Sequence, residues 1–244
     1  MELKPIRTRT DDQPAGRGVT YESTHDVAAT ESGRRVLRNV YLLLAASLVP
    51  TAIGALLGAN LDLSFLRASP IISSFAILGI FYGWIFAIEK NRNSGLGVGL
   101  LLGFTAFMGV LMGPLLQAVL GLANGVQLVA MAAGGTAAVF FGLAGVASTS
   151  KRDFGTMGNF LTVGAIVIML AVVANIFFQS PAVYLALLGA FIIFSSLMIL
   201  WQVNQIVRGG ETNYVSATLS LYVALYNLFT SLLQLLGIFG GSRD

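Results

Sequence analysis

The sequence predicts an all-α integral membrane protein with seven transmembrane helices. Apolar side chains make up 56% of the 244 residues and charged side chains only 10%, whereas about one-quarter of the residues of a soluble domain are charged. Seven continuous apolar stretches, each of about 19 to 25 residues, are long enough to cross ~30 Å of hydrocarbon as helices. The strands of a membrane barrel are about 10 residues long and alternate in polarity, which argues against a barrel.

The first 33 residues differ in composition from the rest of the chain. Residues 1–33 are polar and have no apolar periodicity, so we predict a disordered tail. A secretory signal would place its apolar core directly after the first charges, and we therefore expect no cleavage. The only histidine, His25, lies in this tail among scattered carboxylates, which do not form a metal site.

Residues 34–237 form the predicted transmembrane domain, and residues 238–244 form a short tail on the far side. The predicted spans, in order, are Leu37–Gly58, Pro70–Ile88, Leu96–Leu120, Val126–Ser148, Gly158–Phe178, Pro181–Trp201 and Tyr214–Leu236. Pro50 and Pro114 lie inside the first and third spans, where a proline bends a helix. Only Gln179 and Ser180 separate the fifth span from the sixth, so this connection is either a tight hairpin or part of one re-entrant element.

Positive charges fall mainly on one side of the predicted bundle. With the amino terminus in the cytoplasm, the cytoplasmic side carries Lys4, Arg7, Arg9, Arg17, Arg34, Arg35, Arg38, Lys90, Arg92, Lys151, Arg152 and Arg208. Only Arg67 and Arg243 fall on the other side. Loops on the cytoplasmic side of membrane proteins are enriched in Lys and Arg, so we predict this orientation, with the carboxyl terminus in the periplasm.

The last span is the predicted centre of the bundle. Residues 213–237 read NYVSATLSLYVALYNLFTSLLQLLG, which is apolar overall but carries a stripe of hydroxyls and amides. Polar side chains in hydrocarbon need partners, and a bundle interior supplies them. We therefore expect the other spans to surround this helix.

Glycines recur at a spacing of four residues in several spans. The pairs include Gly54 and Gly58, Gly79 and Gly83, Gly95 and Gly99, and Gly109 and Gly113. This spacing lets helix backbones approach closely. The glycines serve either packing within the bundle or a homo-oligomer interface, and both alternatives stay open.

Chemistry-bearing groups are scarce in the predicted spans. Apart from Arg38 at a boundary, no span contains Lys, Arg, Asp, Glu or His. Proton relays and ion-coupled carriers normally place such a group at membrane depth. Intramembrane proteolysis would need a Ser with His, two aspartates or a zinc-binding HExxH helix. We therefore predict that the protein is not an enzyme and has no catalytic, cofactor-binding or metal-binding residues and no cofactor.

Three segments carry a resemblance to a known family. They are FTAFMGVLMGPLL (Phe104–Leu116), AAGGTAAVFFGLAGVASTSKRDFGTMG (Ala132–Gly158) and LWQVNQIVRGGETNYVSATLSLYVALYNLF (Leu200–Phe229). Together they resemble the Bax inhibitor-1 family, also called the transmembrane BAX inhibitor motif family. The segments VLRNVYLLL, GGETNY and SLYVALYN and the terminal SRD are most similar to bacterial inner-membrane members that modulate the AAA protease FtsH.

The resemblance also implies where an ion-gating site would lie. Other bacterial members resemble calcium leak channels in which two aspartates share a proton, and the matching positions here are Gln202 and Ala224. An amide and a methyl group do not titrate, so the resemblance does not carry a pH switch to this chain. The flanking pattern matches at Asn204, Gln205, Tyr222 and Asn227, and we expect these residues, with Ser220, to form a polar interior.

Two functions follow from the resemblance. The first is a bacterial inner-membrane protein that binds and modulates a membrane-anchored AAA protease of the FtsH type, as a slow or competing substrate gripped by its cytoplasmic tail. The alternative is a calcium or proton leak channel, weakened by the loss of the aspartate pair. A loop carboxylate such as Glu89, Asp153 or Glu211 folded into the interior would favour the alternative. No nucleic-acid partner is expected, because the cations flank the spans.

Overall fold

A computed structural model describes residues 21–61, 69–150 and 152–241, with side chains from Gly33 onward. The described helices are α1 (Tyr21–Asn60), α3 (Pro70–Lys90), α4 (Gly95–Leu120), α5 (Gly125–Thr149), α6 (Met157–Phe178), α7 (Pro181–Val207) and α8 (Tyr214–Gly240). All seven are long and apolar enough to cross a membrane. The predicted seven-helix membrane bundle is therefore confirmed, and most helices extend a few residues beyond the predicted spans.

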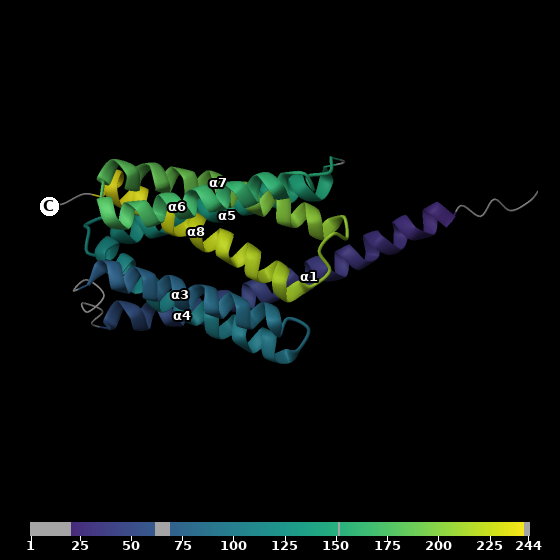
Figure 1. Cartoon of the computed structure of the whole chain (residues 1–244), viewed down its shortest axis with the longest axis horizontal. Helices are drawn as coiled ribbons and strands as arrows, with labels where there is room; N and C mark the ends of the chain where they lie inside the picture. Colours follow the sequence, from purple (N-terminus) through teal and green to yellow (C-terminus); the bar gives the residue numbers. More distant parts are fainter. Residues whose placement is uncertain (1–20, 62–68, 151, 242–244) are drawn as a thin grey trace, which may run out of the picture.

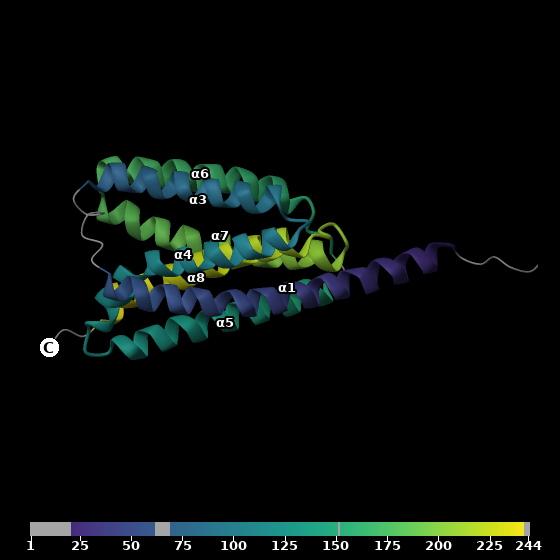
Figure 2. The same ribbon diagram turned by 90° about the horizontal axis from the view of Figure 1, so that it is seen from below.

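The first helix begins earlier than the sequence predicts. Residues 21–33, which we assigned to a disordered tail, form the first turns of α1. Ala28, Ala29 and Glu31 in this segment have high helix propensity, so the helix can begin well before the apolar span does. These turns project beyond the bundle in both views (Figures 1 and 2). The remainder of the predicted tail, residues 1–20, lies outside the described residues.

Successive helices run in opposite directions between two ends of the bundle (Figure 1). One end, which we call the basic end, carries every described cation: Arg34, Arg35, Arg38, Lys90, Arg92, Arg152 and Arg208. The connection between α6 and α7 is a hairpin, because each helix is long enough to span. Gln179 ends α6 in a left-handed conformation (φ 48°), and the Ser180 hydroxyl accepts the Val183 N–H at 3.5 Å to begin α7.

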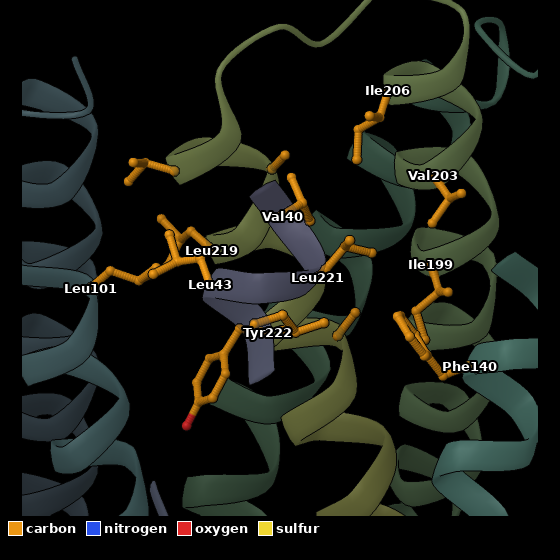
Figure 3. Packing of buried hydrophobic residues seen from close by; sticks show 14 of the residues in the cluster. Val40, Leu43, Leu101, Phe140, Ile199, Val203, Ile206, Leu219, Leu221 and Tyr222 are labelled. Atoms are coloured by element: carbon orange, nitrogen blue, oxygen red, sulfur yellow. The ribbon is translucent and has the colours of Figure 1, made fainter. Parts of the chain in front are cut away.

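The last helix lies at the centre of the bundle, as predicted. Helix α8 packs against α1, α3, α4, α5 and α7, whereas α6 packs only against α3 and α7. Its buried polar residues are Ser216, Thr218 and Ser231. Figure 3 shows Tyr222 and Leu221 of α8 among apolar side chains of α1, α4, α5 and α7. Part of the polar stripe of α8 is therefore buried, whereas Ser220, Asn227 and Gln234 are partly exposed.

Glycines bring α1 and α4 into direct backbone contact. A Cβ atom added at Gly54 or Gly58 would collide with the backbone at Ala106 or Val110, and one added at Gly109 would collide with the backbone at Thr51. Gly113 faces Gly58 in the same way. By contrast, a Cβ at Gly79, Gly83, Gly95 or Gly99 would meet nothing within 4 Å. Two of the predicted pairs therefore pack within the bundle.

Candidate functional site

Tyrosine hydroxyls of α8 tie it to α1 and α4. The Tyr222 hydroxyl and Thr51 Oγ1 are 2.8 Å apart, and Tyr222 also donates to the Thr105 carbonyl at 3.3 Å. One turn further along, the Tyr226 hydroxyl donates to the Met108 carbonyl at 3.1 Å. Both phenols are thereby satisfied inside the bundle, which is what a polar group in hydrocarbon requires. These bonds give Tyr222 a structural role.

The two positions that match the family's aspartate pair are buried. Gln202 on α7 is 3% exposed and Ala224 on α8 is 4% exposed, and these two helices pack against each other. Two turns before Gln202, the buried Ser195 hydroxyl has no hydrogen-bond partner among the described residues. Between them along α7 lies Ile199, which is fully buried (Figure 3). Apolar packing therefore interrupts the polar groups on this face of α7.

Asn204 holds a loop rather than lining a membrane cavity. Its Oδ1 accepts the Phe154 N–H at 3.2 Å, and its Nδ2 donates to the carbonyls of Ala147 and Arg152, each at 3.4 Å. Asn204 is fully buried. Its amide thereby anchors the basic end of α7 to the end of α5 and to the loop that leads into α6.

Replacing the buried Asn204 with Leu should lower the free energy of unfolding by about 2 kcal/mol, because the partly buried Phe154 N–H loses its acceptor. Asn159 on α6 is the matched control, since its side chain is exposed. We expect Asn159→Leu to change the stability by no more than about 0.5 kcal/mol. Thermal unfolding of the purified protein in detergent measures both variants. Equal losses would contradict an anchoring role for Asn204.

The other residues predicted for the polar interior lie in different places. The Gln205 side chain lies against Gly210 in the α7–α8 loop, and Ser220 is partly exposed. Asn227 lines a cavity of about 310 Å³ between α6, α7 and α8. Further polar residues line the cavity: Asn175, Tyr184, Thr230, Ser231 and Gln234. The Tyr184 hydroxyl donates to Gln234 Oε1 across it. The predicted residues therefore do not form one continuous site.

A carboxylate reaches α8 at the basic end, where Ser216 Oγ donates to Glu89 Oε2 at 2.9 Å. Arg92 pairs with the same oxygen at 3.3 Å. The Glu89 side chain is 36% exposed, so this carboxylate lies at the surface rather than in the interior. Sequence reasoning placed Glu89 in a loop, whereas α3 continues to Lys90. The two remaining carboxylates, Asp153 and Glu211, bond to the loop N–H groups of Gly155 and Asn213, both at 2.7 Å.

Comparison with known proteins agrees with this architecture. The family model described as "Inhibitor of apoptosis-promoting Bax1" matches residues 33–241, which include all seven apolar spans. The chain belongs to this family. The family match begins at Gly33, where a Cβ atom would approach the carbonyl oxygens of Ile206 and Val207 to 3.0 Å. The shared region therefore begins at a residue that packs against the end of α7.

Several bacterial relatives match this chain over nearly the whole of their own length. An uncharacterized protein of Neisseria meningitidis serogroup A is 47% identical over 218 residues, which is 87% of this chain and 96% of the relative. A protein of Escherichia coli K12 named "Modulator of FtsH protease YccA" is 41% identical over 222 residues, covering 91% of this chain and 97% of its own. The same figures hold for "Inner membrane protein YccA" of Escherichia coli O6:H1. The predicted family resemblance is confirmed.

Proposed function

We propose that the protein binds and modulates a membrane-anchored AAA protease of the FtsH type in a bacterial inner membrane. The observation that carries this proposal is the 41% identity, over 91% of this chain, to a relative named as a modulator of that protease. The basic end is the cytoplasmic end in this proposal, because all described cations lie there. The amino-terminal segment is then on the side where an ATP-driven protease would grip it.

The fold supports the role of a slow or competing substrate. Residues 21–33 project from the basic end, and Gly33 at this end of α1 packs against the end of α7. A protease that pulls on this segment would pull α1 away from α4. Glycine-mediated contacts at Gly54, Gly58, Gly109 and Gly113 oppose that separation. The protease would therefore stay engaged while the bundle resists extraction.

Deleting residues 2–30 tests the proposed engagement. The deletion ends before Gly33, so the bundle should keep its stability while co-purification with the protease and degradation by it fall. A variant in which a glycine–serine segment of equal length replaces residues 2–30 is the matched control. It distinguishes a requirement for this sequence from a requirement for a segment of this length. Deleting residues 242–244, at the other terminus, should change neither readout. Unchanged co-purification and degradation after deletion of residues 2–30 would refute the tail mechanism.

In this proposal the protein acts without catalysis. Among the described residues, no group of three His, Cys, Asp or Glu side chains is placed to hold a metal ion. Glu89, the carboxylate that reaches α8, is paired with Arg92 at the surface. Binding to the protease is then the activity to measure.

An ion leak is the second candidate function. The observation that favours it is the polar cavity of about 310 Å³ between α6, α7 and α8, whose amides and hydroxyls could hold water at membrane depth. Gln202 and Ala224 cannot supply a shared proton, so this leak would lack the pH dependence implied by the family's aspartate pair. Calcium flux into liposomes separates the two candidates, since a protease modulator gives none.

A further inference from the structure

A groove lies between α1 and α5, with α8 as its floor. In the described part of the chain, no Cα atom of α1 lies within 8 Å of a Cα atom of α5. The space between them has a volume of about 560 Å³, within the range of roughly 300–1,000 Å³ that holds whole small-molecule ligands. Figure 2 shows α1 and α5 along the same side of the bundle.

The walls of the groove are apolar. Exposed alanines line both walls: Ala45 and Ala52 on α1, and Ala133 and Ala137 on α5. Along the apolar part of the groove, the bordering hydroxyls have partners in the protein: Thr136 donates to the Ala132 carbonyl at 2.7 Å, Thr51 and Tyr222 bond to each other, and Tyr226 donates to the Met108 carbonyl at 3.1 Å. The remaining phenol, Tyr41, lies at the basic end of the groove. The occupant therefore needs no hydrogen-bonding group inside the groove. An apolar chain of the surrounding bilayer meets that requirement.

Arg38 lies at the basic end of this groove. The groove residues of α1 include Tyr41, Ala45, Leu48 and Ala52, and Arg38 precedes Tyr41 by three positions on the same helix face. Three residues of helix rise about 4.5 Å, so Arg38 comes just beyond the last aromatic residue of this wall. Its side chain is exposed. Tyr41 also meets Phe140 of α5, with ring centroids 6.0 Å apart, which marks the end of the groove.

We propose that this groove holds one acyl chain of an anionic phospholipid, whose phosphate binds Arg38 without the competing cation that the choline of a zwitterionic lipid supplies. A guanidinium binds phosphate through charge-assisted hydrogen bonds, and the headgroups of a bilayer lie where a helix leaves the hydrocarbon. The apolar walls take the chain, and the cation selects the headgroup. This site is separate from Gln202, Ala224 and the amino-terminal segment.

Lipid retention by the full-length protein tests the proposal. The protein is purified in mild detergent and exposed to phosphatidylglycerol or phosphatidylcholine with identical acyl chains, and retained lipid is counted by native mass spectrometry. The unaltered protein should retain phosphatidylglycerol in preference to phosphatidylcholine. Arg38→Gln should lower that preference about fivefold, the contribution of one basic residue at a membrane surface. Lys90→Gln is the matched control, because Lys90 is an exposed cation at the same end on α3, which does not line the groove.

Filling the groove tests the acyl-chain contact separately. Ala52→Phe and Ala133→Phe, one on each wall, should each abolish retention of both lipids. Both alanines are exposed, so these variants should fold. Ala76→Phe on α3 is the control, since Ala76 is exposed outside the groove, and it should retain lipid normally.

Three results would overturn the proposal. If Arg38→Gln and Lys90→Gln lost the preference for phosphatidylglycerol equally, that preference would come from diffuse surface charge rather than from Arg38. Unchanged retention in both groove-filled variants would place the lipid elsewhere. Groove-filled variants that keep their lipid but lose a co-purifying membrane protein would show that the groove takes a partner's helix instead.

Discussion

Replacing Gly109 with Ala should destabilise the bundle by about 3 kcal/mol, a large loss for a single added methyl group. The new Cβ would collide with the backbone at Thr51 and approach the Ala55 N–H. Backbone atoms cannot rotate away as a side chain can, so α1 and α4 must separate. Unfolding of the purified protein with increasing denaturing detergent, followed by circular dichroism, measures the loss.

Gly79→Ala is the matched control for this prediction. Gly79 is also a helical glycine in an apolar span, but an added Cβ meets nothing within 4 Å. Alanine has the higher helix propensity, so this variant should gain up to ~1 kcal/mol. If Gly109→Ala were as stable as Gly79→Ala, the direct backbone contact between α1 and α4 would be wrong. The stability changes of the two variants should have opposite signs, which separates the effect of backbone packing from that of helix propensity.

Introducing Gln202→Asp together with Ala224→Asp should create a pH-dependent calcium leak in liposomes. Both positions are buried where α7 packs against α8. Two buried carboxyls cannot both ionise cheaply, so the second charge appears only as the pH rises. Two charges would push the helices apart and attract Ca²⁺. We expect the leak to rise at least tenfold from about pH 5 to about pH 8, because each pH unit raises the ionised population of a mostly protonated carboxyl about tenfold.

The stability of this double variant should follow the same titration. In acid both carboxyls are neutral and carry no penalty, and the folded state loses stability as the pH rises and the buried carboxyls ionise. Gln202→Asn with Ala224→Asn is the control, because it adds polarity without charge. A leak of equal size and pH dependence in the asparagine variant would exclude proton sharing. A strong pH-dependent leak in the unaltered protein would contradict the role we assign to Gln202 and Ala224.

The sequence predicted the helices well because their signal is local. Length and continuous apolarity identify each span without knowledge of its neighbours. The polar stripe of α8 likewise identified the central helix, since Tyr222 and Ser216 needed partners that only a bundle provides. The start of α1 was missed because the prediction relied on apolar periodicity, and residues 21–33 are helical without it.

The site was less predictable because it depends on contacts between distant segments. The spacing of Gly54 and Gly58 is the same as that of Gly79 and Gly83, yet only the first pair meets another backbone. The hydrogen bond between Ser216 and Glu89 joins residues 127 positions apart, and no local sequence pattern in either segment indicates it. Asn204 matched the family pattern, but its loop-anchoring role required the position of Phe154.

The central position of α8 has a consequence for biosynthesis. Five other helices pack against α8, and it is the last of the seven to leave the ribosome. The nascent chain therefore inserts α1 and α3–α7 into the bilayer before α8, the helix that packs between them, is available. Until α8 has inserted, Thr51 lacks the Tyr222 phenol and the carbonyls of Thr105 and Met108 lack their tyrosine donors. The interval before α8 inserts is when quality control would meet this chain in its least assembled form.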